Sequence, residues 1–193
     1  MARLIYAMNT SLDGYISDRD GKFEWGVPSR EFYADINELE RPVGTYLYGR
    51  HMYETMAVWE TAHLDTGGPA FTPGLLELEC EFAAIWRAAD KIVFSTTLPR
   101  ASTPRTRIER AFDPDQIRRL KATSERDLTV GGPRLAAAMI AANLVDEFHV
   151  FVHPIIIGDG NPWLPRDHRI PLELAGERRL GGGVVHLHYR RAS

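Results

Sequence analysis

The chain has 193 residues, of which 44% are hydrophobic and 25% are charged, and its formal net charge is −3 at pH 7. This length and composition predict one globular domain over residues 1–193, with a sizeable hydrophobic core. Because the balance is slightly acidic and the lysines and arginines are scattered, we expect no basic surface for nucleic acid.

The cysteine content and the N-terminus exclude further classes. A single cysteine, Cys80, rules out an internal disulfide framework and a cysteine-based zinc site, and we expect it to be a buried free thiol. The first apolar run is too short for the core of a signal peptide, and no run approaches membrane-spanning length. We therefore expect a cytoplasmic protein with a small-molecule ligand and no membrane partner.

Strand and helix signals alternate along the chain, which favours an α/β fold with a mostly parallel sheet. Strands are predicted at residues 4–8, 45–49, 91–95, 128–130 and 147–153. Helices are predicted at 29–39, 51–57, 74–89, from 113–114 onward and at 133–143. Residues 172–180 and 184–191 predict an antiparallel hairpin closed by a glycine turn, and residues 60–73 and 158–171 predict loops.

A glycine turn joins the strand at 128–130 to the helix that follows it. Gly131 and Gly132 carry no side chains, and Pro133 stands at the first helical position, where its missing N–H costs little. Free backbone N–H groups and the positive end of the helix dipole would therefore face a diphosphate. A tight turn in an α/β core explains the same residues, and the spacing alone does not decide between the two.

Two more strand ends carry polar residues. Gly49, Arg50, His51 and Met52 start a helix, where the arginine can pair with a phosphate or remain a solvated surface residue. Ser95-Thr96-Thr97 follows another strand and can bind a ribose or phosphate, or form a hydroxyl-capped turn. Ligands of open α/β sheets bind at the carboxyl ends of strands, so the three segments together predict a dinucleotide groove.

Longer motifs carry a resemblance to a known family. These are SLDG at 11–14, YGRHMYETM at 48–56, VFSTTL at 93–98 and the block from VGGP to GDG at 130–160. The chain resembles the dihydrofolate reductase-like superfamily, and within it the branch that contains the C-terminal reductase domain of riboflavin biosynthesis. The resemblance implies three α/β/α layers with a mixed, mostly parallel eight-stranded sheet, NADPH as hydride donor and a homodimer.

The resemblance also implies a set of cofactor-binding residues. The segment that holds the phosphates of the cofactor is matched by Gly49, Arg50, His51 and Met52. Ser95 and Thr96 match the hydroxyl pair on the adenosine side. Those matching the turn and helix start under the nicotinamide and diphosphate are Gly131, Gly132, Pro133, Arg134 and Leu135.

The chain departs from this pattern in two places. It has neither the cysteines nor the length for the zinc-dependent deaminase domain of fused riboflavin enzymes, so deamination is excluded. Dihydrofolate reductases place an acidic residue on the first helix, but the matching position here is Tyr33, and Asp35 points elsewhere at helical spacing. Asp13 is a second acidic candidate, although an Asp-Gly turn also explains it. Asp13 and Asp35 are the candidate catalytic residues.

The candidate substrate-binding residues are aromatic. Tyr33 occupies the helix position just described, and Trp25 and Trp59 can stack on a flat heterocycle or belong to the core. We expect an NADPH-dependent reductase of a planar, nitrogen-rich heterocycle, of the kind of 5-amino-6-(5-phosphoribosylamino)uracil. The alternatives are a pterin reductase of the dihydrofolate reductase type and a non-catalytic nucleotide- or drug-binding protein.

Four histidines alternate on strand faces, His149 with His153 and His186 with His188. With no acidic or cysteine partner at ligand spacing, and with the hairpin pair expected to face water, we predict no metal site.

Overall fold

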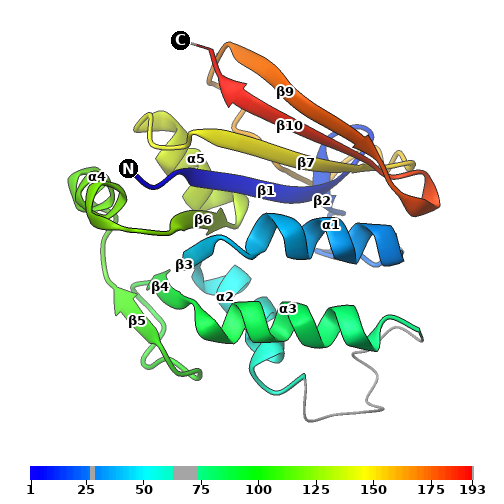
Figure 1. The fold of residues 1–193 in the computed structure, drawn as a ribbon. Coiled ribbons are helices and arrows are strands. Elements are labelled where there is room, and N and C mark those ends of the chain that lie inside the picture. The colour runs from blue at the N-terminus through cyan, green and yellow to red at the C-terminus, as the bar shows by residue number, and fades with distance from the viewer. Residues whose placement is uncertain (27–28, 63–73, 193) are drawn as a thin grey trace.

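The computed structural model describes residues 1–26, 29–62 and 74–192. They form three layers, with helices on both faces of a central sheet (Figure 1). The sheet has eight strands in the order β5-β4-β3-β6-β1-β7-β10-β9, which confirms the predicted fold class.

Six strands of the sheet run parallel, and the C-terminal hairpin completes it. The parallel strands are β1 (Leu4–Ser11), β3 (Val43–Gly49), β4 (Asp90–Phe94), β5 (Thr106–Glu109), β6 (Asp127–Gly131) and β7 (Glu147–His153). The hairpin strands are β9 (Leu172–Arg179) and β10 (Val185–Arg191), and β10 pairs antiparallel with both β7 and β9. A separate small ladder joins β2 (Tyr15–Ser17) to β8 (Asn161–Pro162).

The helices divide between the two faces of the sheet (Figure 1). One face carries α1 (Arg30–Glu40), α2 (Arg50–Met56), η1 (Ala57–Glu60) and α3 (Leu76–Ala88), and the other carries α4 (Pro114–Thr123) and α5 (Pro133–Ala141). The predicted cap of α1 is confirmed, because the Ser29 side chain accepts a hydrogen bond of 3.1 Å from the backbone of Phe32. Within the described residues, no helix combines the length and apolar character needed to cross a bilayer.

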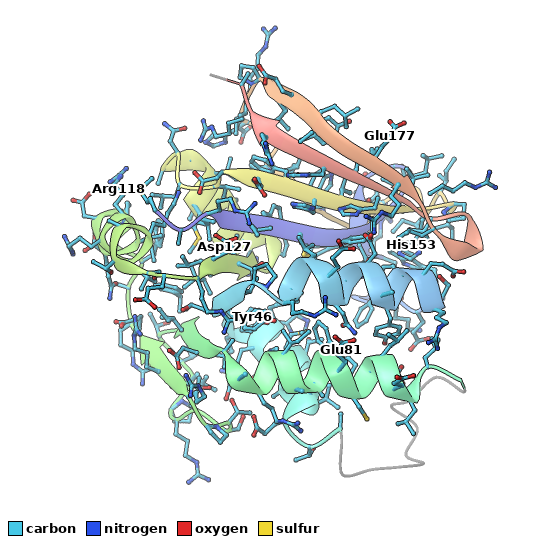
Figure 2. All side chains as sticks on the ribbon, viewed as in Figure 1. Tyr46, Glu81, Arg118, Asp127, His153 and Glu177 are labelled. Carbon is cyan, nitrogen blue, oxygen red and sulfur yellow. The ribbon has the colours of Figure 1, made fainter. Side chains whose placement is uncertain are left out.

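The apolar core is unevenly distributed. Under α4 and α5 it is extensive and includes Leu4, Tyr6 and Phe148. Under α2 and α3 a second cluster holds Tyr46, Tyr48 and Trp86, with Tyr46 between the sheet and the helix layer (Figure 2). In the described part of the chain, the cluster between α1 and the hairpin has four buried members, which are Phe32, Phe151, Leu180 and Val184. Polar side chains therefore fill much of the remaining space beneath α1.

The strand order sets the position of the site. β4, β3 and β6 are neighbours and run parallel, so their carboxyl ends lie side by side. This row of strand ends is called the carboxyl edge below. The segment that follows each of these strands is one of the three predicted to bind a dinucleotide. Cys80, in α3, is half-buried rather than fully buried, because the helix packs on the sheet and α1 along only part of its surface.

Candidate active site

The three predicted cofactor segments lie together in the structure. Gly49, which begins α2, pairs with Phe94 at the end of β4, and Tyr48 pairs with Gly131 at the end of β6. The start of α2 is therefore flanked by the loop after β4 on one side and by the β6–α5 turn on the other. Ligand sites in parallel sheets form at such carboxyl edges.

A hydrogen bond joins the start of α2 to the loop after β4. The Arg50 guanidinium donates to the Thr97 hydroxyl at 3.0 Å and to Glu54, one turn along the helix, at 2.8 Å. The Arg50 side chain is 46% exposed, so it also has donors free for a ligand. The hydrogen bond between Arg50 and Thr97 was not predicted, because the spacing of residues in the sequence does not indicate which side chains of separate loops are in contact.

The Ser95 hydroxyl stabilises this loop, whereas the Thr96 side chain is exposed to solvent. Ser95 Oγ accepts from the backbone of Leu98 at 3.0 Å and from that of Thr97 at 3.3 Å, so it forms the hydroxyl-capped turn that the sequence allowed. Thr96 is exposed next to it. The Arg110 guanidinium also fixes the position of this loop, because it donates a hydrogen bond of 2.9 Å to the Ser95 carbonyl.

The β6–α5 turn packs directly against α2. A Cβ added at Gly131 would stand 2.6 Å from the Tyr48 ring and 3.0 Å from the Met52 side chain. Gly132 has a φ of +95°, which L side chains rarely adopt, and a Cβ there would meet Met52 at 3.4 Å. Both glycines are therefore required for the close approach of this turn to α2.

The start of α5 offers free donors. Among the residues that the structure describes, no side chain caps it, while Leu135 lies in the core and Arg134 is exposed beside it. His51 is exposed on α2, and a Cβ built on Gly49 would meet no atom of the described residues within 4 Å, which leaves room for a ligand beside them. Cationic side chains and uncapped amides at an open edge suit the phosphates of a dinucleotide.

The aromatic candidates have different surroundings. Tyr33 lies on the side of α1 that faces α3, where burial and the nearby Glu79 carboxylate raise its pKa. Trp59 packs edge-on against the Phe82 ring, with ring centres 4.8 Å apart, which matches the core alternative. Trp25 packs edge-on against His153 at the carboxyl end of β7, with ring centres 5.4 Å apart. The structure thus places Trp25 at the carboxyl edge and Tyr33 near it, at the start of α1.

Asp13 is exposed and ties two loops together. It accepts backbone hydrogen bonds from Gly158 at 2.8 Å and from Ile157 at 3.3 Å. A hydrogen bond from Ser11 and these backbone donors hold the pKa of Asp13 below its usual value. These contacts match the turn alternative for the Asp-Gly pair.

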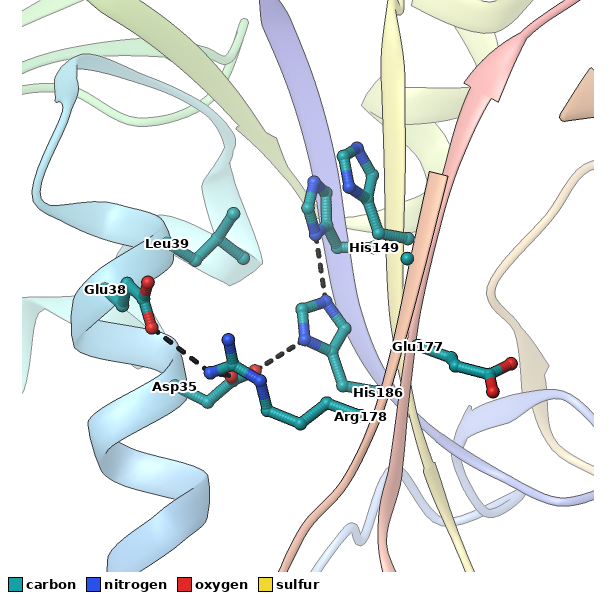
Figure 3. Close-up of a pocket in the computed structure, with 9 residues that line it drawn as sticks. Asp35, Glu38, Leu39, His149, Glu177, Arg178 and His186 are labelled. Atoms are coloured by element: carbon teal, nitrogen blue, oxygen red, sulfur yellow. Dashed lines mark hydrogen bonds and ion pairs between the residues drawn. The ribbon is translucent and has the colours of Figure 1, made fainter. Parts of the chain in front are cut away.

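Asp35 faces the hairpin rather than the cofactor segments (Figure 3). It pairs with the Arg178 guanidinium and, at 2.5 Å, with His186 Nδ1. Burial acts to raise the pKa of Asp35, but these two partners outweigh it, and the pKa lies below its usual value. Tyr33 and Asp35 are about 200° apart around the helix, so the structure does not bring Asp35 to the cofactor segments.

Comparison with known proteins supports the resemblance. The profile of the RibD C-terminal domain matches residues 2–186. Among curated proteins, the chain is 26% identical to the uncharacterized protein YyaP of Bacillus subtilis (strain 168), over 97% of this chain and 94% of that protein.

Two solved structures show the same fold. A diaminohydroxyphosphoribosylaminopyrimidine deaminase/5-amino-6-(5-phosphoribosylamino)uracil reductase from Thermotoga maritima superposes with a TM-score of 0.66 at 14% identity, covering 99% of this chain and 57% of that one. Dihydrofolate reductase from Enterococcus faecalis, complexed with NADP(H) and RAB-propyl, superposes with a TM-score of 0.62 at 15% identity, over 99% and 97% of the two chains. At these identities the likeness concerns the fold. Because the family profile covers nearly all of its residues, the chain belongs to the RibD C-terminal domain family.

Proposed function

We propose that the protein is an NADPH-dependent reductase of a small, planar, nitrogen-rich heterocycle. The observation that carries the proposal is the meeting of three segments at one edge of the sheet, through Arg50 with Thr97 and Met52 with the Gly131-Gly132 turn. Membership of a reductase family and the NADP(H) complex of a protein with the same fold support it.

Each segment has a proposed role toward the cofactor. Arg50 pairs with the extra phosphate that distinguishes NADPH from NADH, Arg134 pairs with the diphosphate, and the uncapped amides at the start of α5 add hydrogen bonds. Ser95 and Thr96 contact the adenosine side, while Gly131 and Gly132 leave the nicotinamide side free of side chains. When bound, NADPH supplies the hydride, and the contribution of the protein is to hold the two reactants in the reactive orientation.

The proton has two expected sources, a carboxylate or water. Asp13 ties two loops together and Asp35 is paired with Arg178 and His186, so both carboxylates are engaged away from the cofactor segments. Their contacts favour water as the proton source. Tyr33, next to Glu79, is proposed to orient the heterocycle at the start of α1.

We expect NADPH oxidation with an aminopyrimidine such as 5-amino-6-(5-phosphoribosylamino)uracil and negligible oxidation with dihydrofolate. A protonated pterin needs a carboxylate partner in a low-dielectric cleft, and Tyr33 cannot provide one. Steady-state assays on both substrates, with Asp13→Asn and Asp35→Asn as matched variants, test this expectation. Robust dihydrofolate turnover that survives both substitutions would contradict it, and NADPH binding without turnover on any heterocycle would favour the non-catalytic alternative.

We also expect a homodimer. The outer face of the hairpin exposes Leu174 and Val185, which are 53% and 37% exposed, and β9 leaves one edge of the sheet unpaired within the described residues. Apolar side chains beside an open strand edge favour association with a second copy. Light scattering after size exclusion should give about twice the chain mass of 21.8 kDa. A monomer at micromolar concentration would refute this expectation.

A further inference from the structure

Three potential metal ligands meet on the face of the sheet beneath α1. Side chains alternate along β7, so Glu147 and His149 share this face, and the register of β10 places His188 directly opposite His149. Glu147 Oε2 lies 3.6 Å from His149 Nε2 and 3.3 Å from His188 Nε2. One ligand atom from each of the three residues fits within 4.8 Å of the other two.

The two separations from Glu147 match those between neighbouring ligand atoms of a tetrahedral metal site. Zinc binds histidine nitrogen and carboxylate oxygen at about 2.0–2.2 Å, which puts neighbouring ligand atoms of a tetrahedron about 3.3–3.6 Å apart. The Glu147 carboxylate is within this range of both imidazoles. Two histidines and one glutamate are also a ligand set that zinc accepts with one position left open.

The two imidazole nitrogens are unsatisfied. His149 Nε2 and His188 Nε2 are buried and have no hydrogen-bond partner among the described residues. Buried polar atoms are normally paired, so two such atoms facing one carboxylate need an explanation.

A chain of hydrogen bonds links Asp35, His186 and His149. His186 Nδ1 lies 2.5 Å from Asp35 and donates to that carboxylate, and in the neutral form of His186 the Nε2 atom is an acceptor. His149 Nδ1 lies 2.9 Å from His186 Nε2 and donates to it in this neutral form (Figure 3). His149 Nε2 is then a bare lone pair that faces the Glu147 carboxylate. Two electron-rich atoms in this position favour a cation between them.

We propose that Glu147, His149 and His188 bind a divalent transition metal ion, of which Zn²⁺ suits the ligands best. This site is additional to the proposed reductase function and independent of it. Two of the three ligands, His149 and His188, line a cavity of about 270 Å³ between α1 and the hairpin, which has room for a fourth ligand. An exchangeable water or a small anionic ligand can occupy it.

The remaining contacts of Glu147 are compatible with a bound ion. Arg190 Nε donates to Oε1 at 3.1 Å, and Arg3 bridges both oxygens at 3.2 Å, so the carboxylate stays oriented while Oε2 faces the histidines.

Binding of one ion by both histidines requires the His188 ring to turn. His149 and His188 are stacked with ring centres 4.0 Å apart and planes 15° from parallel, so their lone pairs run side by side. The contact with His186 holds the His149 ring, so rotation about the Cβ–Cγ bond of His188 has to bring its nitrogen toward the ion, and the cavity that His188 lines gives space for this rotation.

The sequence expectation about these histidines was wrong in two respects. Glu147 is an acidic partner at ligand spacing, two residues before His149 on the same strand face. His186 and His188 do not face open water, because α1 covers this side of β10 and leaves their side chains only 13% and 19% exposed. The site lies two strands away from the β6–α5 turn, about 10 Å at the usual strand spacing, which separates it from the cofactor segments.

Zinc titration of the full chain tests the proposal. The protein, prepared without a polyhistidine tag and treated with EDTA, is titrated with Zn²⁺ against a chromophoric chelator, and with Co²⁺ to record the visible spectrum. We expect one ion per chain and a tetrahedral cobalt spectrum. His188→Gln and Glu147→Gln should each weaken zinc binding at least tenfold, whereas His168→Gln, an exposed histidine in the loop before β9, should leave it unchanged.

His186→Gln keeps the test decisive if Glu147→Gln fails to fold. His186 does not touch the ion but orients His149, and loss of such an outer contact weakens metal binding about 10- to 100-fold. Circular dichroism establishes that each variant is folded. The proposal is overturned if the native protein binds no zinc, or if His188→Gln and His186→Gln bind it as tightly as the native chain. NADPH oxidation does not enter these measurements, so the two proposals fail separately.

Discussion

Replacing Arg50 by alanine should remove most of the preference for NADPH over NADH. A charge-assisted hydrogen bond to the extra phosphate is worth about 1.5–3 kcal/mol, or roughly 10- to 150-fold in affinity. Arg50 stands at the start of α2 beside Thr97, with its side chain 46% exposed. Calorimetric titration of both cofactors into both proteins measures the change, which should fall on NADPH and spare NADH.

Arg118→Ala is the matched control for this experiment. Arg118 lies in α4, on the other face of the sheet from α2. It is exposed and, like Arg50, pairs with a carboxylate of its own helix, so its loss should leave both affinities unchanged. Equal affinity of the native protein for NADPH and NADH would contradict the assignment of Arg50. So would an Arg50→Ala variant that keeps the native preference.

The Glu40→Gln variant should have a higher free energy of unfolding than the native chain, and this difference should grow as the pH rises from about 4.5 to above 7. Glu40 ends α1 in a buried position next to the Tyr46 hydroxyl, with Tyr48 and Arg126 nearby. Burial raises the pKa of Glu40 to about 7, from an ordinary value of 4.5. The native state therefore binds a proton more tightly than the unfolded chain does.

The sign of the effect follows from this difference. The stability that the protonated Glu40 contributes is complete below pH 4.5 and is lost as the pH rises through 7. Glutamine cannot ionise, so the variant should gain up to about 3 kcal/mol over the native chain across this interval. Urea unfolding at several pH values measures it, with Glu31→Gln, an exposed residue of the same helix, as control. A difference between variant and native protein that does not change with pH would contradict the expected burial of the charge.

The main strands and helices of this fold are predictable because their signals are local. Apolar runs gave β1, β3, β4, β6 and β7, and Ser29 and Asp113 marked the starts of α1 and α4. The strands that were not predicted are short and lie away from the centre. β5 is an edge strand with the sequence TRIE, and β8 has two residues, so neither has a periodic pattern long enough to detect.

The candidate cofactor site was predictable because each of its segments is a continuous motif. Arg50 next to Gly49, and Gly131 next to Gly132, need only local sequence to be found at the end of a strand. The contacts of Asp35 and His149 could not be predicted in this way. Asp35 meets Arg178 across 143 positions, and His149 meets His186 across 37, so these partners are set by how α1 and the hairpin pack on the sheet.

The position of β1 has a consequence for how the chain folds. β1 lies near the middle of the sheet, but its partners β6 and β7 come more than 120 positions later, with Leu4 opposite Leu128 and Ile5 opposite Glu147. During synthesis this strand remains without its neighbours until most of the domain has left the ribosome. Its buried side chains Leu4, Ile5 and Tyr6 are exposed throughout that time, which makes the nascent segment a ligand for chaperones. Closing such long loops also makes folding slow compared with a fold built from local contacts.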